Sequence, residues 1–438
     1  MNKRRPTALH TKILIGLAAG IVGGIFVNLL SVKYPGVGKF TNEYVIKYIT
    51  GPLGRIFLNL LFMTVVPLVF STLTVGITNL GDLRRLGRIG MKTLVFFLML
   101  TALGTILGLT STALFKPGEG FDKETQTRLL DTYRGDILQK SSSFHDRGGF
   151  GVDTFINIVP RNPLASMVNM DMLAVIFFAL MMGAALTMIK SEKVYLVTGA
   201  LEVISQTMMK IVGIAMKLAP VAVPALIFNV VARFGVDLLE KLLLYAVVVF
   251  GGYIVFLFVV YGIILRFISG VKPLGFFKRI IPVMVTAFST SSSNATLPTT
   301  LKVSEEDVGI PKDIAGFVLP LGATMNMNGT ALYEGVTVLF LAQVFGIHFG
   351  IGGQIIVVLL SVLMAIGTAG VPGASLPMIM IVLSAVGVPP EGIAIILGID
   401  RILDMGRTVL NVTGDVVTST YITRSEGLAP RGNDSIFI

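Results

Sequence analysis

The chain has 438 residues, of which 53% are hydrophobic and only 14% are charged, with a mean hydropathy of +0.83. Soluble domains carry about 25% charged residues, so this composition argues against an ordinary soluble enzyme. Lys and Arg outnumber Asp and Glu by ten. Because the charges lie mostly between long apolar runs, the positive-inside bias explains this excess better than nucleic-acid binding does. The sequence has no cysteine, which excludes disulfides and cysteine metal sites. We therefore predict a polytopic membrane protein.

Six apolar runs in the first 265 residues approach the roughly 20 residues that a spanning helix needs. They cover Ile13–Ser31, Phe57–Gly76, Leu94–Leu114, Met170–Ile189, Ile211–Val231 and Leu242–Leu265. The first run is too long for a signal-peptide core. Between Lys116 and Met170 lies a long polar segment of mixed charge, which we expect outside because long loops translocate regardless of sign. The basic segments Arg84–Lys92 and Arg266–Arg279 then lie inside, together with both chain ends.

Two later segments are too apolar for surface loops and too short to span a bilayer. Each has two apolar legs of about a dozen residues around a polar tip, at Ser289–Thr296 and at Thr368–Ser375. A helical leg reaches roughly 20 Å, less than the ~30 Å hydrocarbon core. Re-entrant hairpins resolve this conflict, and kinked spanning helices are the alternative. Each hairpin precedes an apolar segment broken by polar residues, Ile314–Phe345 and Gly392–Tyr421, a pattern that points to a transporter binding site.

One helix face near the C-terminus carries charge within an apolar context. At about 100° per residue, an arc of about 80° holds three carboxylates, one guanidinium and one amide. These are Asp400, Asp404, Arg407, Asn411 and Asp415. A charge at mid-bilayer costs about 2.5–3.5 kcal/mol, so this face should line a cavity or bind a ligand. A structural Asp404–Arg407 ion pair is the alternative, but we expect it to leave the other polar groups without partners.

Polar residues also recur at every second position from 324 to 330, a spacing that matches no helix face. They are Thr324, Asn326, Asn328 and Thr330. An unwound segment with free carbonyls would suit a small hard cation, and an ordinary kinked helix is the alternative. The hairpin tips would add helix N-terminal amides, which favour an anionic group.

Together these groups match an acidic amino acid. Arg407 suits a side-chain carboxylate because its fork binds bidentately, and Asp404 suits an ammonium. A dicarboxylate such as succinate or malate needs no Asp404, and a neutral amino acid would leave Arg407 unpaired. An intramembrane enzyme using Ser291–Ser293 as nucleophiles would lack an embedded His or Cys. A channel is a further alternative, but paired hairpins fit the alternating-access mechanism of a transporter better.

Three stretches resemble the dicarboxylate/amino acid:cation symporter family of glutamate transporters, and the similarity covers nearly the whole chain. They are residues 326–333 (NMNGTALY), 367–373 (GTAGVPG) and 404–415 (DMGRTVLNVTGD). The resemblance implies an all-α fold with eight transmembrane helices and two re-entrant helical hairpins, built from inverted repeats. It also implies an elevator-type symporter, not an enzyme, that is coupled to protons or sodium and uses no other cofactor. The hairpins would gate the site from opposite sides.

The resemblance further implies a homotrimer in a prokaryotic cytoplasmic membrane, with lipid and a small acidic amino acid as partners and no nucleic acid. The expected divisions are scaffold helices in 1–90 and 170–235, a third span at 91–115, an outer loop at 116–169, a transport domain at 236–425 and a cytoplasmic tail at 426–438.

Site residues carry over by motif. Substrate ligands would be Ser293, Thr330, Val371, Asp404, Arg407, Thr408 and Asn411. A first sodium site would use Gly322, Asn326, Asn411 and Asp415. A second, formed mostly by backbone oxygens, would use Thr324, Ala365, Ile366 and Thr368.

The chain departs from the family pattern at the third sodium site. Asn328 replaces an acidic ligand, and Phe97 and Leu100 replace a tyrosine and a threonine, so that only Thr101 is retained. Losing a carboxylate and two oxygens should leave this site without a cation.

Two further positions bear on coupling and on substrate support. Glu334 resembles the glutamate of proton-coupled members, so we hypothesise that protons replace some sodium. The extra arginine of the family is found neither at Ser291 nor at Met405. Arg401 would fill that role from one turn earlier, with Asp400 beside it.

Overall fold

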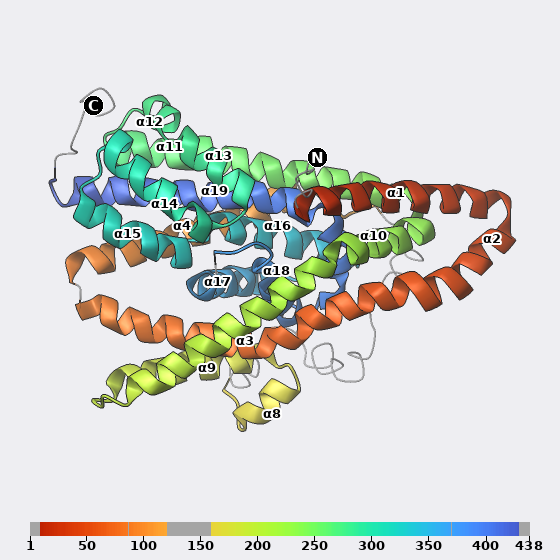
Figure 1. Cartoon of the computed structure of the whole chain (residues 1–438), viewed down its shortest axis with the longest axis horizontal. Coiled ribbons are helices and arrows are strands. Elements are labelled where there is room, and N and C mark those ends of the chain that lie inside the picture. The colour runs from red at the N-terminus through yellow and green to blue at the C-terminus, as the bar shows by residue number, and fades with distance from the viewer. Residues whose placement is uncertain (1–8, 86, 121–158, 369, 429–438) are drawn as a thin grey trace, which may run out of the picture.

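The computed structural model describes residues 9–85, 87–120, 159–368 and 370–428, which are almost entirely helical (Figure 1). No β-strand occurs in these ranges. The basic N-terminal residues, most of the polar loop and most of the expected tail lie outside the described residues.

Helices from the first half pack against one another in an extended arm (Figure 1). α1 lies along α10, and α3 packs against both α9 and α10. A short α2 and the π-helix η1 join α1 to α3. The bounds are α1 Leu9–Lys33, α2 Pro35–Phe40, η1 Thr41–Thr50, α3 Gly51–Arg85, α8 Pro163–Val168, α9 Met172–Met188 and α10 Val194–Val255.

α10 contains a sharp bend at Gly235, whose φ of 72° is a conformation that favours glycine. The bend separates two long apolar stretches, Val194–Gly235 and Leu238–Ile268. It falls at the boundary expected between scaffold and transport domain, and the division into those domains remains a prediction.

The remaining helices gather around α19, which contacts α4, α10, α13, α15 and α16. Their bounds are α4 Arg88–Phe115, η2 Phe256–Val260, α11 Tyr261–Ile263, η3 Ile264–Ile268, α12 Pro273–Arg279, α13 Ile281–Thr290, α14 Ser293–Val303, η4 Ser304–Val308, α15 Lys312–Met325, α16 Asn328–Val344, α17 Ile351–Gly367, α18 Ser375–Ala385, η5 Pro390–Gly392 and α19 Ile393–Ser425.

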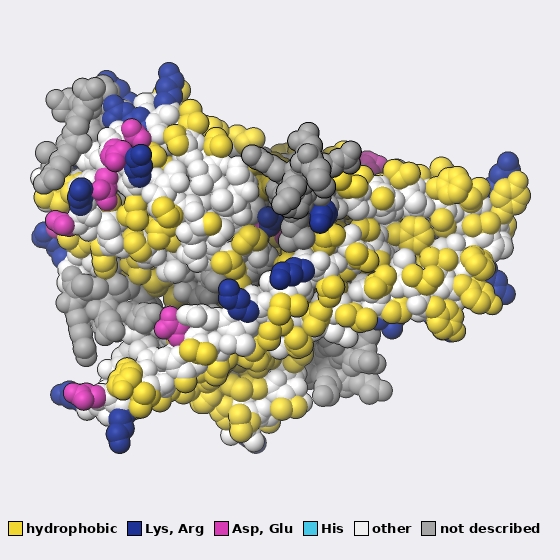
Figure 2. All heavy atoms as spheres, in the orientation of Figure 1, with side chains coloured by type: hydrophobic (Ala, Val, Ile, Leu, Met, Phe, Trp, Pro, Cys, Tyr) yellow, Lys and Arg dark blue, Asp and Glu magenta, His cyan; other side chains and the backbone are white. Residues whose placement is uncertain are grey.

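The outer surface of the arm is apolar (Figure 2). Val32 is 81% exposed and Val22 68%, both on α1. Five of the described helical stretches are long and apolar enough to cross a bilayer. Because extended apolar surface is unstable in water and stable in lipid, the prediction of a polytopic membrane protein is confirmed. The number of spans remains a prediction.

The two segments predicted as re-entrant hairpins each consist of two contacting helices, α13 with α14 and α17 with α18, and their re-entrant course in a membrane remains a prediction. The first tip is shorter than predicted, because Ser293 already begins α14. Ser292 caps that helix by accepting a hydrogen bond from the Ala295 amide at 3.2 Å. Ser375 likewise begins α18.

The segment 314–345 is broken as predicted, but the break is brief. Only Asn326 and Met327 leave helical geometry, between α15 and α16. Thr324 and Thr330 lie inside helices, so the longer unwound stretch that we predicted is wrong. Segment 392–421 is interrupted by polar residues only in its composition, and the helix face predicted for 400–415 is confirmed, because α19 runs unbroken through it. Its polar residues find partners on neighbouring helices and leave the helical hydrogen bonds intact.

The two hairpins have different surroundings. The second packs against α3 and α9 of the arm, and its Gly373 lies next to Met216 of α10. The first packs mainly on α15 and α19. In this conformation, therefore, the arm restrains the second hairpin.

Candidate functional site

A cavity of about 20 Å³ lies where both hairpin tips, the break before α16 and the middle of α19 meet. All seven predicted substrate residues line it: Ser293, Thr330, Val371, Asp404, Arg407, Thr408 and Asn411. A water molecule needs roughly 10–15 Å³ of such volume. The cavity therefore has room for little more than a water molecule, and a larger ligand requires its lining to move.

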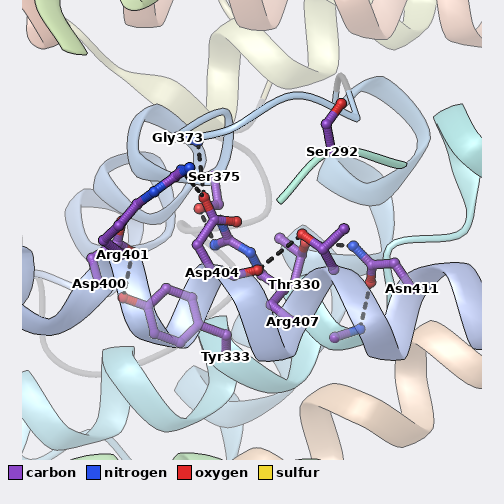
Figure 3. Close-up of polar contacts among 12 residues, drawn as sticks. Ser292, Thr330, Tyr333, Gly373, Ser375, Asp400, Arg401, Asp404, Arg407 and Asn411 are labelled. Carbon is purple, nitrogen blue, oxygen red and sulfur yellow. Dashed lines mark hydrogen bonds and ion pairs between the residues drawn. The ribbon is translucent and has the colours of Figure 1, made fainter. Parts of the chain in front are cut away.

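Asp404 is the centre of a charged cluster in this cavity (Figure 3). Its Oδ1 lies 2.5 Å from Nη2 of Arg407, and its Oδ2 lies 3.3 Å from Nη1 of Arg401. The second tip contacts the same cluster, since the Gly373 amide donates to Asp404 Oδ2 at 3.3 Å and Arg407 donates to the Ser375 hydroxyl. The Asp404–Arg407 ion pair that we gave as an alternative is thus present, inside the predicted site.

The three groups that we expected this ion pair to leave without partners all have one. Asp400 accepts from the Tyr333 hydroxyl at 2.8 Å, and Asp415 accepts from the Asn326 amide at 2.8 Å. Asn411 accepts from a backbone amide at the start of α16 at 2.7 Å. The sequence argument against the ion pair was therefore wrong. Other segments of the chain supply these partners, and the spacing of residues along a single helix does not reveal such contacts.

Asp400 and Tyr333 support the cluster from behind. Neither lines the cavity. The Arg407 guanidinium lies 5.2 Å from the centre of the Tyr333 ring, a cation–π arrangement. Tyr333 therefore contacts both charges and fixes their relative position.

The first predicted sodium site is partly assembled. Gly322 lies directly against the Asp415 carboxylate, where a Cβ would overlap it. Asn326 contributes a buried Oδ1 that has no hydrogen-bond partner among the described residues. A buried carboxylate beside an unpaired amide oxygen suits a hard cation. The Asn411 side-chain oxygen accepts a hydrogen bond from the start of α16, and the participation of Asn411 in this site remains a prediction.

The second predicted sodium site falls at the C-terminus of α17. Ala365 and Ile366 lie in its last turn, where carbonyls lack helical donors and the helix dipole is negative. Thr368 follows and donates its hydroxyl to the Met364 carbonyl at 2.7 Å. Thr324 is exposed and donates to its own helix, so its participation remains a prediction.

At the third sodium site, which we predicted to hold no cation, the side chains form a neutral hydrogen-bond chain. Asn328 accepts from the Thr101 hydroxyl at 3.1 Å and donates to the Tyr261 hydroxyl at 3.0 Å. Phe97 and Leu100 are fully buried beside it. With its polar atoms paired to protein groups, this region offers a cation no free carboxylate.

Glu334 lies in α16, 1% exposed, and does not line the cavity. Neither of its carboxylate oxygens has a hydrogen-bond partner among the described residues. Its polar neighbour is the Ser361 hydroxyl of α17. An unpaired buried carboxylate is costly when ionised, so this position favours binding of a proton.

Sequence reasoning missed two serines as candidate ligands. Ser291 has a strained φ of 50°, and its buried hydroxyl lacks a partner among the described residues and borders the cavity. Ser375 also borders the cavity and binds Arg407. Both serines belong to the polar tips. The polar composition identified these tips in the sequence, but it did not indicate which of their residues face the cavity.

Comparison with known proteins gives a consistent result. The model of the sodium:dicarboxylate symporter family matches residues 9–425. The proton/sodium-glutamate symport protein of Bacillus subtilis is 34% identical over 97% of this chain and 94% of its own length. The proton/glutamate-aspartate symporter of Escherichia coli is 36% identical over 96% and 93%. The C4-dicarboxylate transport protein of Bacillus subtilis is 31% identical over 95% and 94%.

Proposed function

Because the chain belongs to the sodium:dicarboxylate symporter family, we propose that it is a secondary symporter that takes up acidic amino acids, glutamate or aspartate, together with protons or sodium ions. One observation carries the choice of substrate. The cavity presents a guanidinium, Arg407, and a carboxylate, Asp404, joined to each other at 2.5 Å.

An acidic amino acid can separate this ion pair without leaving either charge unpaired. Its side-chain carboxylate takes Arg407 from Ser375, and its ammonium takes the place of Arg407 at Asp404. In a buried site an unpaired charge costs several kcal/mol, so a ligand with both charges is favoured over one with a single charge. Ser293, Thr408 and Asn411 remain to hold the α-carboxylate.

The buried charges also explain why cations must accompany the substrate. Four carboxylates, at Asp400, Asp404, Asp415 and Glu334, face two guanidiniums, which gives a net charge of minus two when all are ionised. An acidic amino acid adds one more negative charge. Since net charge is unfavourable in a low-dielectric interior, sodium at Asp415 or a proton on Glu334 makes loading favourable.

The second candidate is a C4-dicarboxylate symporter. It is favoured by the 31% identical C4-dicarboxylate relative. Succinate or malate would engage Arg407 but would bring a second carboxylate towards Asp404. This repulsion favours amino acids over dicarboxylates.

We extend the proposal to architecture. We propose eight spans and two re-entrant hairpins, divided between a scaffold and a transport domain. We also propose a homotrimer in a prokaryotic cytoplasmic membrane with both chain ends in the cytoplasm. Family membership supports each of these features. The contact of the second hairpin with α3 supports a gating role that depends on the position of the arm.

An ion-replacement flux assay in proteoliposomes tests the function. Labelled aspartate, glutamate and malate are offered under a sodium gradient, a pH gradient or neither. We expect saturable accumulation of the two amino acids that follows at least one gradient, with weaker malate uptake. Accumulation of malate alone would support the dicarboxylate alternative, and uptake without accumulation would indicate a channel.

A further inference from the structure

Two guanidiniums contact Asp404 in this structure, whereas a bound amino acid would offer it a single ammonium. Arg407 binds Oδ1 from the cavity side, while Arg401 binds Oδ2 at 3.3 Å. The Arg401 side chain is only 11% exposed, and its buried Nε has no hydrogen-bond partner among the described residues. It does not border the cavity. Arg401 therefore reaches a ligand only through Asp404.

Substrate binding changes the contacts of Arg407 but not those of Arg401. A substrate carboxylate draws Arg407 away from Asp404, whereas Arg401, outside the cavity, stays in place. Asp404 then faces the ligand as a carboxylate that is still partly neutralised. This residual neutralisation weakens its attraction for an ammonium and also weakens its repulsion of a second carboxylate.

We propose that Arg401 is a positioning residue that sets selectivity between acidic amino acids and C4-dicarboxylates, by neutralising Asp404 from the side opposite the ligand. The inference rests on the proposed function. Without Arg401, Asp404 keeps its full charge once Arg407 has moved. Ligands with an ammonium then bind more tightly relative to dicarboxylates. The second carboxylate of a dicarboxylate is repelled more strongly, because Arg401 no longer neutralises part of the Asp404 charge.

The expected size of the effect of Arg401 on selectivity follows from the geometry of its contact. The Arg401 contact is longer than that of Arg407 and its side chain is slightly exposed, so its effect is partial. We expect the ratio of malate inhibition constant to aspartate KM to change by about tenfold on removal of the charge.

The experiment measures uptake of labelled aspartate into proteoliposomes and its competition by malate and succinate. The variants are Arg401→Gln, which removes the charge, and Arg401→Lys, which keeps it. Arg424→Gln is the matched control. It removes an exposed arginine from the same helix, 20 residues beyond Asp404 and so about 30 Å along the axis.

We expect Arg401→Gln to raise the malate-to-aspartate ratio about tenfold, Arg401→Lys to restore most of the original ratio, and Arg424→Gln to leave it unchanged. An unchanged ratio in Arg401→Gln, an equal loss of both ligands, or malate that never competes in the unmodified protein overturns the selectivity role. If Arg401→Gln does not yield folded protein, Arg401→Met, which also removes the charge but keeps an unbranched side chain, takes its place; a raised ratio there supports the role and an unchanged one contradicts it. Failure of the unmodified protein to accumulate aspartate refutes the proposed function itself, a result that is separate from any change of ratio.

Discussion

The hydroxyl of Ser292 donates a hydrogen bond of 2.6 Å to the carbonyl of Gly370, which joins the tips of the two hairpins. The backbone amide of Asn294 donates to the same carbonyl at 3.2 Å. Gly370 has no room for a side chain, since a Cβ would lie 2.6 Å from the Ala323 carbonyl. The two tips therefore hold each other beside the cavity that contains the Asp404–Arg407 ion pair.

Substituting Ser292 by Ala should make the tips separate more readily. A hydrogen bond of this kind contributes about 1 kcal/mol, which corresponds to about fivefold in an opening equilibrium. The chain has no cysteine, so Val371→Cys would introduce a single thiol at the cavity. We expect Ser292→Ala to speed its modification by a water-soluble thiol reagent about fivefold. Ser289→Ala is the control, because that hydroxyl is exposed and bonds its own helix; a similar acceleration there would contradict the role of the tip contact.

Substituting Asp404 by Ser should separate the two substrate classes. The variant removes the partner of an ammonium, so we expect aspartate affinity to fall about a hundredfold, in line with the 2–5 kcal/mol cost of breaking a buried charge pair. Malate loses a repulsive neighbour and should change by less than tenfold. Isothermal titration of the detergent-purified protein measures both ligands. Equal losses would show that Asp404 does not contact an ammonium.

Substituting Glu334 by Gln should remove proton coupling while retaining substrate exchange. The neutral amide mimics the protonated acid and cannot release a proton. In proteoliposomes we expect uptake driven by a pH gradient to fall at least tenfold, with aspartate exchange at equal concentrations preserved.

Glu391 provides the matched control for this experiment. It lies in the short η5 turn before α19, and burial raises the pKa of its carboxyl to about 7. It therefore titrates in the range in which uptake is measured. If Glu391→Gln abolishes the pH response and Glu334→Gln preserves it, the proton carrier is wrongly assigned.

The end of α19 should make stability depend on pH. Glu426 pairs with Lys92 at 2.7 Å and with Arg88 at 2.5 Å, both at the start of α4. These bonds, first that of Lys92 and then that of Arg88, lower the pKa of the Glu426 carboxyl below its ordinary value of 4.5. A depressed native pKa stabilises the fold above the unfolded pKa, and this contribution is lost as pH falls through the native pKa.

Thermal unfolding in detergent tests this dependence. We expect the unmodified protein to melt at a higher temperature than Glu426→Gln at pH 7, with the difference shrinking below about pH 4.5 as Glu426 takes up a proton. Glu305→Gln, at a partly exposed position of η4, should show no such convergence. A difference that persists unchanged to pH 3 would mean that the ion pairs do not stabilise the fold.

The sequence alone determined the membrane class and the helical character of the two hairpin segments. Composition and run length suffice for these because a bilayer demands long apolar helices and makes embedded charge conspicuous. The seven substrate candidates were found by motif, and all of them line one cavity.

The tertiary structure alone decided how those charges are paired. Periodicity along α19 places Asp400 and Asp415 on one face, but their partners Tyr333 and Asn326 come from α16 and the break before it. It also decided that Arg401 contacts Asp404 from outside the cavity. These outcomes depend on contacts between segments distant in the chain, and one-dimensional spacing carries no information about which side chains meet across helices.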